Sequence, residues 1–222
     1  MAPGILALVG GAEWQEGCTF DGDLLAASGG ADVLVLPTAA AYEHPDRAVE
    51  TARAWFAGLG GTVRPLNVLT RGDAMDEGSA ATVRDARFVY LSGGSPLHLR
   101  SVLKETPVWD ALVAAWEDGA VVAGSSAGAM ALCDPMVDPR GGALTVGLGL
   151  VENLAVVPHA EEDVAAHHRR TLELAGDDLV VAAVAERTAL LRDPDGGWRV
   201  AGAGGVTVLL GGRDVGLDAL PG

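Results

Sequence analysis

Short apolar runs recur along the chain, with more polar segments between them. Runs of this kind are typical of strands that are buried on both faces of a sheet. They are Ile5–Val9, Val33–Leu36, Val63–Val68, Phe88–Leu91, Val121–Ala123, Ala155–Val157 and Val180–Val184.

Helical patterns lie between several of these runs. Residues 47–59 and 108–116 each place their large apolar side chains on one side of a helix. Strands that alternate with amphipathic helices indicate a parallel arrangement. The pattern therefore predicts an α/β fold with a mostly parallel central sheet flanked by helices.

The pattern changes after residue 178. Short strand-like segments follow at residues 179–185, 189–192, 198–200 and 206–210, with turns such as residues 193–197 between them. They predict antiparallel strands that close one edge of the sheet. Because no repeat, linker or change in composition divides the chain, we expect one domain over residues 1–222.

Composition narrows the range of partners. The chain has 15 basic and 30 acidic residues and a formal net charge of −15, which repels nucleic acid and anionic membranes, so we expect neither as a partner. Cys18 and Cys133 lie far apart and outside any zinc pattern, which favours buried thiols and no metal. No basic secretion signal or bilayer-length apolar run is present, so we expect a cytoplasmic protein.

We expect catalytic residues directly after the predicted strands, because the carboxyl ends of parallel strands meet at one edge of a sheet. Three turns stand there: residues 93–96, residues 124–128 and residues 158–159. The second reads Gly-Ser-Ser-Ala-Gly, the pattern of a nucleophile elbow, in which Ser126 stands exposed before a helix. The helix dipole and the N–H group after the serine can stabilise an oxyanion.

A serine nucleophile needs a base, and histidine is the usual choice. His159 is placed best, at the end of an apolar run and after a proline, whereas His98 fits a wall of the crevice better than the base. Solvated surface positions are the expectation for His44, His167 and His168.

The base needs an acidic partner. Glu186 ends the apolar run at Val180–Ala185, whereas solvated carboxylates are the simpler expectation for the acids in polar stretches, namely Asp134, Asp138, Glu161, Glu162 and Asp163. The chain order Ser126, His159, Glu186 argues against an ordinary α/β-hydrolase, in which histidine comes last.

Four motifs in this order resemble the peptidase E (aspartyl dipeptidase) and cyanophycinase family of serine peptidases, whose fold is related to class I glutamine amidotransferases. The motifs are Leu91-Ser92-Gly93-Gly94, Gly124-Ser125-Ser126-Ala127-Gly128-Ala129, Gly147-Leu148-Gly149-Leu150 leading to His159, and Glu186-Arg187-Thr188-Ala189-Leu190.

The resemblance implies a catalytic mechanism without a cofactor. It implies Ser126 as nucleophile, His159 as general base and Glu186 as orienting acid. It further implies that backbone N–H groups near Gly94 and at Ala127 form the oxyanion hole. A class I glutamine amidotransferase proper carries cysteine at the elbow, so glutaminase activity is not implied.

The expected substrate is a small peptide, including peptides of the aspartyl type, bound near the first turn at Gly93, Ser95, Pro96 and His98. Family members commonly carry Asp-Gln, or Asn and a polar residue, where this chain has Ser95 and Pro96, so aspartyl specificity stays open. An acidic substrate needs local cations, and the candidates are Arg100, Arg140, Arg169, Arg170 and Arg187.

Several alternatives stay open at this point. The fold could serve as a binding or regulatory module without turnover, or as an esterase or amidase of non-peptide substrates. A monomer and a homodimer are both compatible with the sequence. Most tryptophans are expected to pack in the core, with Trp14 the one candidate for a substrate contact. The glycine-rich stretches match neither a dinucleotide site nor a phosphate loop.

Overall fold

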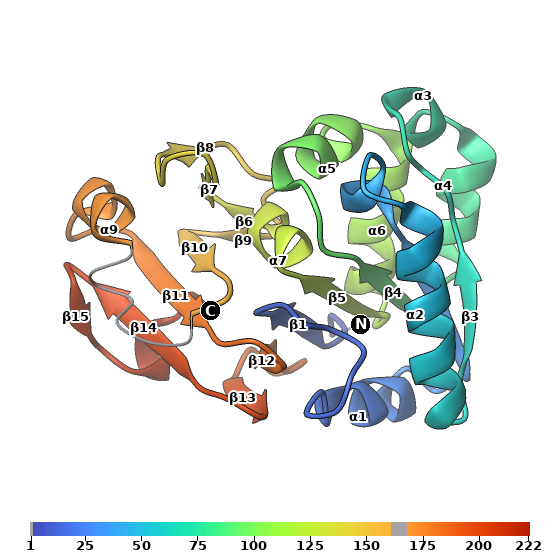
Figure 1. The fold of residues 1–222 in the computed structure, drawn as a ribbon, viewed down its shortest axis with the longest axis horizontal. Coiled ribbons are helices and arrows are strands. Elements are labelled where there is room, and N and C mark those ends of the chain that lie inside the picture. The colour runs from blue at the N-terminus through green and yellow to red at the C-terminus, as the bar shows by residue number, and fades with distance from the viewer. Residues whose placement is uncertain (1, 161–167) are drawn as a thin grey trace.

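The computed structural model describes residues 2–160 and 168–222 of the 222-residue chain. Its main feature is a seven-stranded sheet in the order β13-β12-β1-β5-β4-β2-β3 (Figure 1). The five strands from β1 to β3 in this order run parallel, and β12 and β13 add antiparallel to the β1 edge. The strands are β1 (Leu6–Val9), β2 (Asp32–Leu36), β3 (Thr62–Pro65), β4 (Phe88–Leu91), β5 (Val121–Ser125), β12 (Thr188–Arg192) and β13 (Trp198–Gly202).

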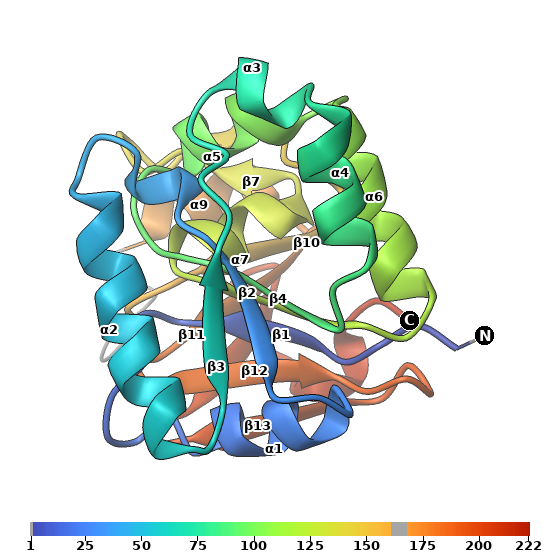
Figure 2. The same ribbon diagram turned by 90° about the vertical axis from the view of Figure 1, so that its right-hand side faces the viewer.

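Helices cover both faces of this sheet (Figure 2). Alternate strand residues point to opposite faces. Leu6 and Leu8 therefore belong to a first apolar core on one face, and Ala7 and Val9 belong to a second core on the other face. The second core is covered by α1 (Phe20–Ala27) and α2 (Pro45–Gly58). The first is covered by α3 (Arg71–Ala74), α4 (Glu77–Arg84), α5 (Pro96–Leu103), α6 (Pro107–Glu117) and α7 (Ala127–Leu132).

A second sheet packs against the first core. It has the order β10-β11-β14-β15, with only β10 and β11 parallel. Its strands are β10 (Leu154–Val157), β11 (Val180–Val184), β14 (Val206–Leu210) and β15 (Arg213–Asp214). Shorter elements complete the described chain: β6 (Cys133–Asp134) with β9 (Val151–Glu152), β7 (Met136–Val137) with β8 (Leu144–Thr145), α9 (Arg169–Ala175), η1 (Thr38–Ala40) and η2 (Leu217–Ala219).

The predicted fold class is confirmed: the protein is α/β, with a large, mostly parallel sheet flanked by helices. Two details of the prediction were wrong. The run at Val63–Val68 is not a buried strand, because β3 ends at Pro65 and lies at the edge of the sheet, where its residues are mostly exposed. The runs at β10 and β11 belong to the second sheet and not to the main one, and so does the segment at 206–210, which is β14 and does not close an edge of the main sheet.

The expected buried thiols are confirmed, since Cys18 and Cys133 are free and buried. Trp14 is also buried, with its ring 5.1 Å from that of Tyr90, so it packs in the core and does not line the pocket described below. Among the helices of the described chain, none has the length and apolar character needed to cross a membrane.

Candidate active site

Ser126 stands at a sharp turn between β5 and α7. Its backbone has a φ of 48° and a ψ of −102°, a conformation that residues other than glycine rarely adopt. The flanking glycines allow this turn, because a Cβ on Gly124 would lie 2.6 Å from Gly128 C, and one on Gly128 would lie 2.7 Å from Leu91 O. α7 approaches β5 at Gly124 and β4 at Gly128 too closely for any larger residue at these two positions.

The structure brings three remote residues together. Ser126 Oγ lies 2.8 Å from His159 Nε2, and His159 Nδ1 lies 2.8 Å from Glu186 Oε1. His159 follows the end of β10, and Glu186 follows the end of β11, so both side chains come from the second sheet. A hydroxyl, an imidazole and a carboxylate are thus in hydrogen-bond contact, the arrangement that activates a serine oxygen.

Two backbone amides flank the serine. Gly94 has a φ of 135°, and a Cβ there would lie 2.3 Å from Ala39 O, so this position accepts only glycine. Ala127 opens α7, where backbone N–H groups have no partner within the helix. Within residues 2–160 and 168–222, neither the Gly94 nor the Ala127 N–H group donates a hydrogen bond to protein. Both are therefore available to an oxygen bound beside Ser126.

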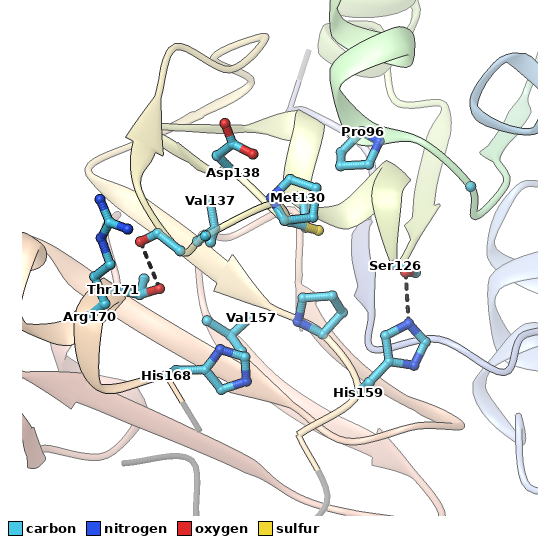
Figure 3. Close-up of a pocket in the computed structure, with 15 residues that line it drawn as sticks. Pro96, Ser126, Met130, Val137, Asp138, Val157, His159, His168, Arg170 and Thr171 are labelled. Atoms are coloured by element: carbon cyan, nitrogen blue, oxygen red, sulfur yellow. Dashed lines mark hydrogen bonds between the residues drawn. The ribbon is translucent and has the colours of Figure 1, made fainter. Parts of the chain in front are cut away.

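A pocket of about 420 Å³ opens at Ser126 and His159 (Figure 3). Its walls are apolar at Pro96 and Met130, on the side of Ser126, and at Val157, which lies beside His168. Polar groups gather at the opposite end, where Asp138, His168, Arg170 and Thr171 lie. The remaining lining residues are Gly94, Val137, Pro139, Gly141, Gly142 and Pro158.

Only one of the five candidate arginines lines this pocket in the described chain, and it is Arg170. Arg140 instead forms an ion pair with Asp138 at 2.6 Å, and its hydrogen bonds lower the pKa of that carboxyl to about 2. Arg169 pairs with Glu173. The expectation of a solvated surface histidine was wrong for His168, which lines the pocket, while His167 and three acids of the sequence analysis, Glu161, Glu162 and Asp163, lie outside the described residues.

Three of the expected substrate-binding residues have other partners. Ser95 caps α5 by accepting a hydrogen bond from His98 N–H. The His98 ring contacts Leu69 O at 2.9 Å. The Gly93 N–H group donates to Glu13 Oε1 at 3.0 Å. Of the four expected residues, only Pro96 lines the pocket.

Sequence reasoning missed Glu13. Its carboxylate accepts hydrogen bonds from Gly93 N–H and from Ser125 Oγ, the residue before Ser126. One signal pointed to it, because Glu13 follows the carboxyl end of β1, where the other site residues were sought on their own strands. No group of three or more His, Cys, Asp or Glu side chains in the described residues is placed to hold a metal ion.

Comparisons with known proteins point to one family. The profile of peptidase family S51 matches residues 6–197. Cyanophycinases of Synechococcus elongatus and Thermosynechococcus vestitus are each 28% identical to the chain over 220 residues, which cover 93% of this chain and 68% of theirs.

Solved structures agree with this match. The crystal structure of a peptidase from an acI-B1 actinobacterium is 29% identical, with a TM-score of 0.79, and the match covers 96% of this chain and 97% of that one. A candidate peptidase E protein of Listeria monocytogenes EGD-e is 18% identical, with a TM-score of 0.66, and the match covers 94% and 99%. At that lower identity the likeness shows the fold alone.

Proposed function

Because this chain belongs to peptidase family S51, and is therefore a serine-type peptidase, we propose that it cleaves small peptides through a triad of Ser126, His159 and Glu186. The observation that carries the proposal is the pair of 2.8 Å contacts that join the serine oxygen to the imidazole and the imidazole to the carboxylate. The turn at Ser126 acts as the nucleophile elbow.

The proposed reaction has two halves. Ser126 Oγ attacks the peptide carbonyl carbon while its proton passes to His159 Nε2, and the negative oxygen that forms is stabilised by the N–H groups of Gly94 and Ala127. The carbon–nitrogen bond then breaks, and His159 gives the proton to the leaving amine. Water, activated by the same imidazole, releases the acyl group from Ser126.

The pocket favours a short peptide with an acidic side chain. Its apolar walls next to Ser126 can cover the aliphatic part of such a side chain. Arg170 supplies a guanidinium at the opposite end, where it can bind a carboxylate through two parallel hydrogen bonds. Asp138 is already neutralised by Arg140, so it does not oppose the binding of an anion.

Ser126→Ala tests the catalytic role. The variant is expected to fold normally and to lose at least ~10³-fold in kcat, since the loss of a triad member removes most of the catalysis. A fluorophosphonate probe should label Ser126 in the wild-type chain and leave the variant unlabelled. Full peptidase activity in Ser126→Ala would refute the proposed mechanism.

Arg170→Gln tests the substrate class. A panel of Asp-X dipeptides, isoaspartyl peptides, cyanophycin, neutral dipeptides and simple esters should be compared for both chains. We expect the wild type to prefer acidic peptides, and the variant to lose about 10-fold or more in kcat/KM for them with little change for neutral ones. Equal losses on acidic and neutral peptides would exclude Arg170 as the specificity residue. Hydrolysis of esters alone would identify an esterase.

A further inference from the structure

Five residues at the carboxyl end of β1 contact residues at or beside Ser126, His159, Glu186 and Gly94. We propose that this anchor segment, Val9–Glu13, holds the catalytic groups in register, and that Glu13 is a positioning residue for catalysis. The proposal rests on the proposed function, because it concerns the geometry of the same triad and of the amides beside it.

Backbone contacts of the anchor segment are the first observation. Three successive carbonyls each accept an N–H group from a remote residue: Val9 O from Ser126 at 2.9 Å, Gly10 O from His159 at 2.8 Å and Gly11 O from Arg187 at 2.8 Å. All three donors have a positive φ, between 48° and 55°. A residue with a side chain keeps a positive φ only where the surrounding structure enforces it. These three hydrogen bonds are made by the strained residues and help to hold them in that conformation.

The second observation is the fit of the His159 ring on the anchor segment. Gly11 has a φ of 118°, and a Cβ there would lie 2.2 Å from His159 Cε1. The imidazole therefore lies directly against the α-carbon of Gly11. The ring is located by the anchor segment on one side and by its bonds to Ser126 and Glu186 at its two nitrogens.

The third observation is the double contact of the Glu13 carboxylate. Oε1 accepts the Gly93 N–H group at 3.0 Å, and Oε2 accepts the Ser125 hydroxyl at 2.7 Å. Ser125 is fully buried and precedes the nucleophile, and Gly93 precedes the oxyanion glycine. Hydrogen bonds to a charged acceptor are roughly twice as strong as neutral ones. Glu13 therefore links the loop after β4 to the end of β5.

This link determines where the Gly94 amide points. The Gly93 N–H group is held by Glu13, and the Ser95 N–H group is held by Ala39 O at 2.8 Å. The backbone is thus fixed on both sides of Gly94, whose own N–H group is left for the oxyanion. Without Glu13, the Gly93 N–H group loses its hydrogen-bond partner, and the backbone before Gly94 is no longer fixed. The Gly94 amide can then turn away from the place where negative charge develops.

Four variants test this role. Glu13→Ala removes both contacts. Glu13→Gln keeps the shape, because its amide oxygen can accept from Gly93 N–H and its NH₂ group can donate to Ser125 Oγ. Ser125→Ala removes one contact alone. Glu16→Gln is the matched control, since it removes an exposed carboxylate three residues further along the same loop.

Steady-state kinetics should show a change in kcat with little change in KM. We expect Glu13→Ala to lower kcat about 10- to 100-fold with less than about 3-fold change in KM, because the oxyanion contact is made only in the transition state. Glu13→Gln should recover most of that loss, and Glu16→Gln should match the wild type. Ser125→Ala should lower kcat by about 3- to 10-fold, and adding it to Glu13→Ala should cost nothing further, because both changes remove the same contact.

Fluorophosphonate labelling gives a readout that needs no peptide substrate, and the labelling rates should follow the same order. A kcat within 2-fold of wild type in Glu13→Ala, with Ser126→Ala inactive, would overturn this inference and leave the proposed function intact. If Glu13→Ala does not fold, Ser125→Ala decides, and an unchanged kcat there would overturn the inference. A wild-type chain that neither labels nor turns over any peptide would overturn the proposed function and this inference with it.

Discussion

Replacing Asp21 should change how the stability of the protein depends on pH. Asp21 lies in α1 and is fully buried. Its Oδ2 accepts a hydrogen bond from Trp55 Nε1 at 2.9 Å, while Oδ1 accepts none from the described residues. Burial raises the pKa of this carboxyl from 3.8 to about 7, the Trp55 bond opposes that rise in part, and the negative charge of Glu13 adds to it.

The raised pKa sets both the sign and the size of the effect. Below pH 4 the carboxyl is protonated in the folded and the unfolded chain, so its contribution to stability is fully present. Between about pH 4 and pH 7 the unfolded chain releases the proton and the folded chain keeps it, so stability falls as the pH rises. Each pKa unit corresponds to about 1.4 kcal/mol, and the whole window is therefore worth up to about 4 kcal/mol.

Asp21→Asn isolates this contribution. Its amide oxygen can still accept from Trp55, while the buried NH₂ group adds a cost that does not depend on pH. Urea unfolding of both chains from pH 4 to pH 8 should show the free energy of unfolding of the variant gaining on that of the wild type by about 2 to 4 kcal/mol, with most of the gain below pH 7. Asp23→Asn, an exposed change in the same helix, should give a constant difference. A constant difference for Asp21→Asn as well would refute the assignment of a buried, protonated carboxyl.

Three further outcomes follow from local geometry. Gly11→Ala should lower kcat by about 100-fold with the secondary structure unchanged by circular dichroism, because its Cβ would displace the His159 ring; a normal kcat would contradict the close contact. Cys133 should resist alkylation in the folded protein, as followed by mass spectrometry, because burial raises its thiol pKa far above the usual range; rapid native labelling would contradict its burial. Asp76→Ala should cost about 1 kcal/mol of unfolding free energy in a urea titration without changing kcat, because Asp76 caps α4 through the Ser79 N–H group; an unchanged midpoint would contradict the cap.

Four strands of the main sheet, β1, β2, β4 and β5, were predictable because they are short and buried on both faces. Their residues alternate between two cores, so each position had to be apolar, and the run at Phe88–Leu91 matches β4 residue for residue. The same rule could not assign β10 and β11 to a second sheet. A buried strand has the same composition in either sheet, and its neighbours are set by partners distant in the sequence.

The three residues that lie together in the candidate site could be selected from the sequence because each one follows a strand end. Ser126 follows β5, His159 follows β10 and Glu186 follows β11, so a rule about strand ends selected all three. Glu13 follows β1 in the same way, but it stands in a polar loop where a solvated carboxylate is the simpler reading. Its two partners lie 80 and 112 residues away, and no local pattern predicts contacts at such distances.

His168 escaped prediction for a similar reason. Beside Arg169 and Arg170 it reads as part of a solvated helix surface. In the structure it precedes α9, which packs beside β8 and β11, and this position turns its ring toward the pocket (Figure 3). Polarity along the chain cannot separate a side chain that lines a cavity from one that faces open solvent, since both are hydrated before a ligand binds.

The side chains of the proposed triad are partly exposed, which gives the backbone a part in positioning them. The side chains of His159 and Glu186 are 49% and 39% exposed, and a polar contact as exposed as this contributes at most about 1 kcal/mol. That contribution alone is too small to offset the conformational entropy that the two side chains lose when they are ordered. The main chain supplies further contacts beside both residues, because Gly10 and Gly11 accept the N–H groups of His159 and Arg187. A substrate that fills the pocket then excludes water from contacts that are already in register, and the hydrogen bonds to the imidazole gain strength when the reaction requires it.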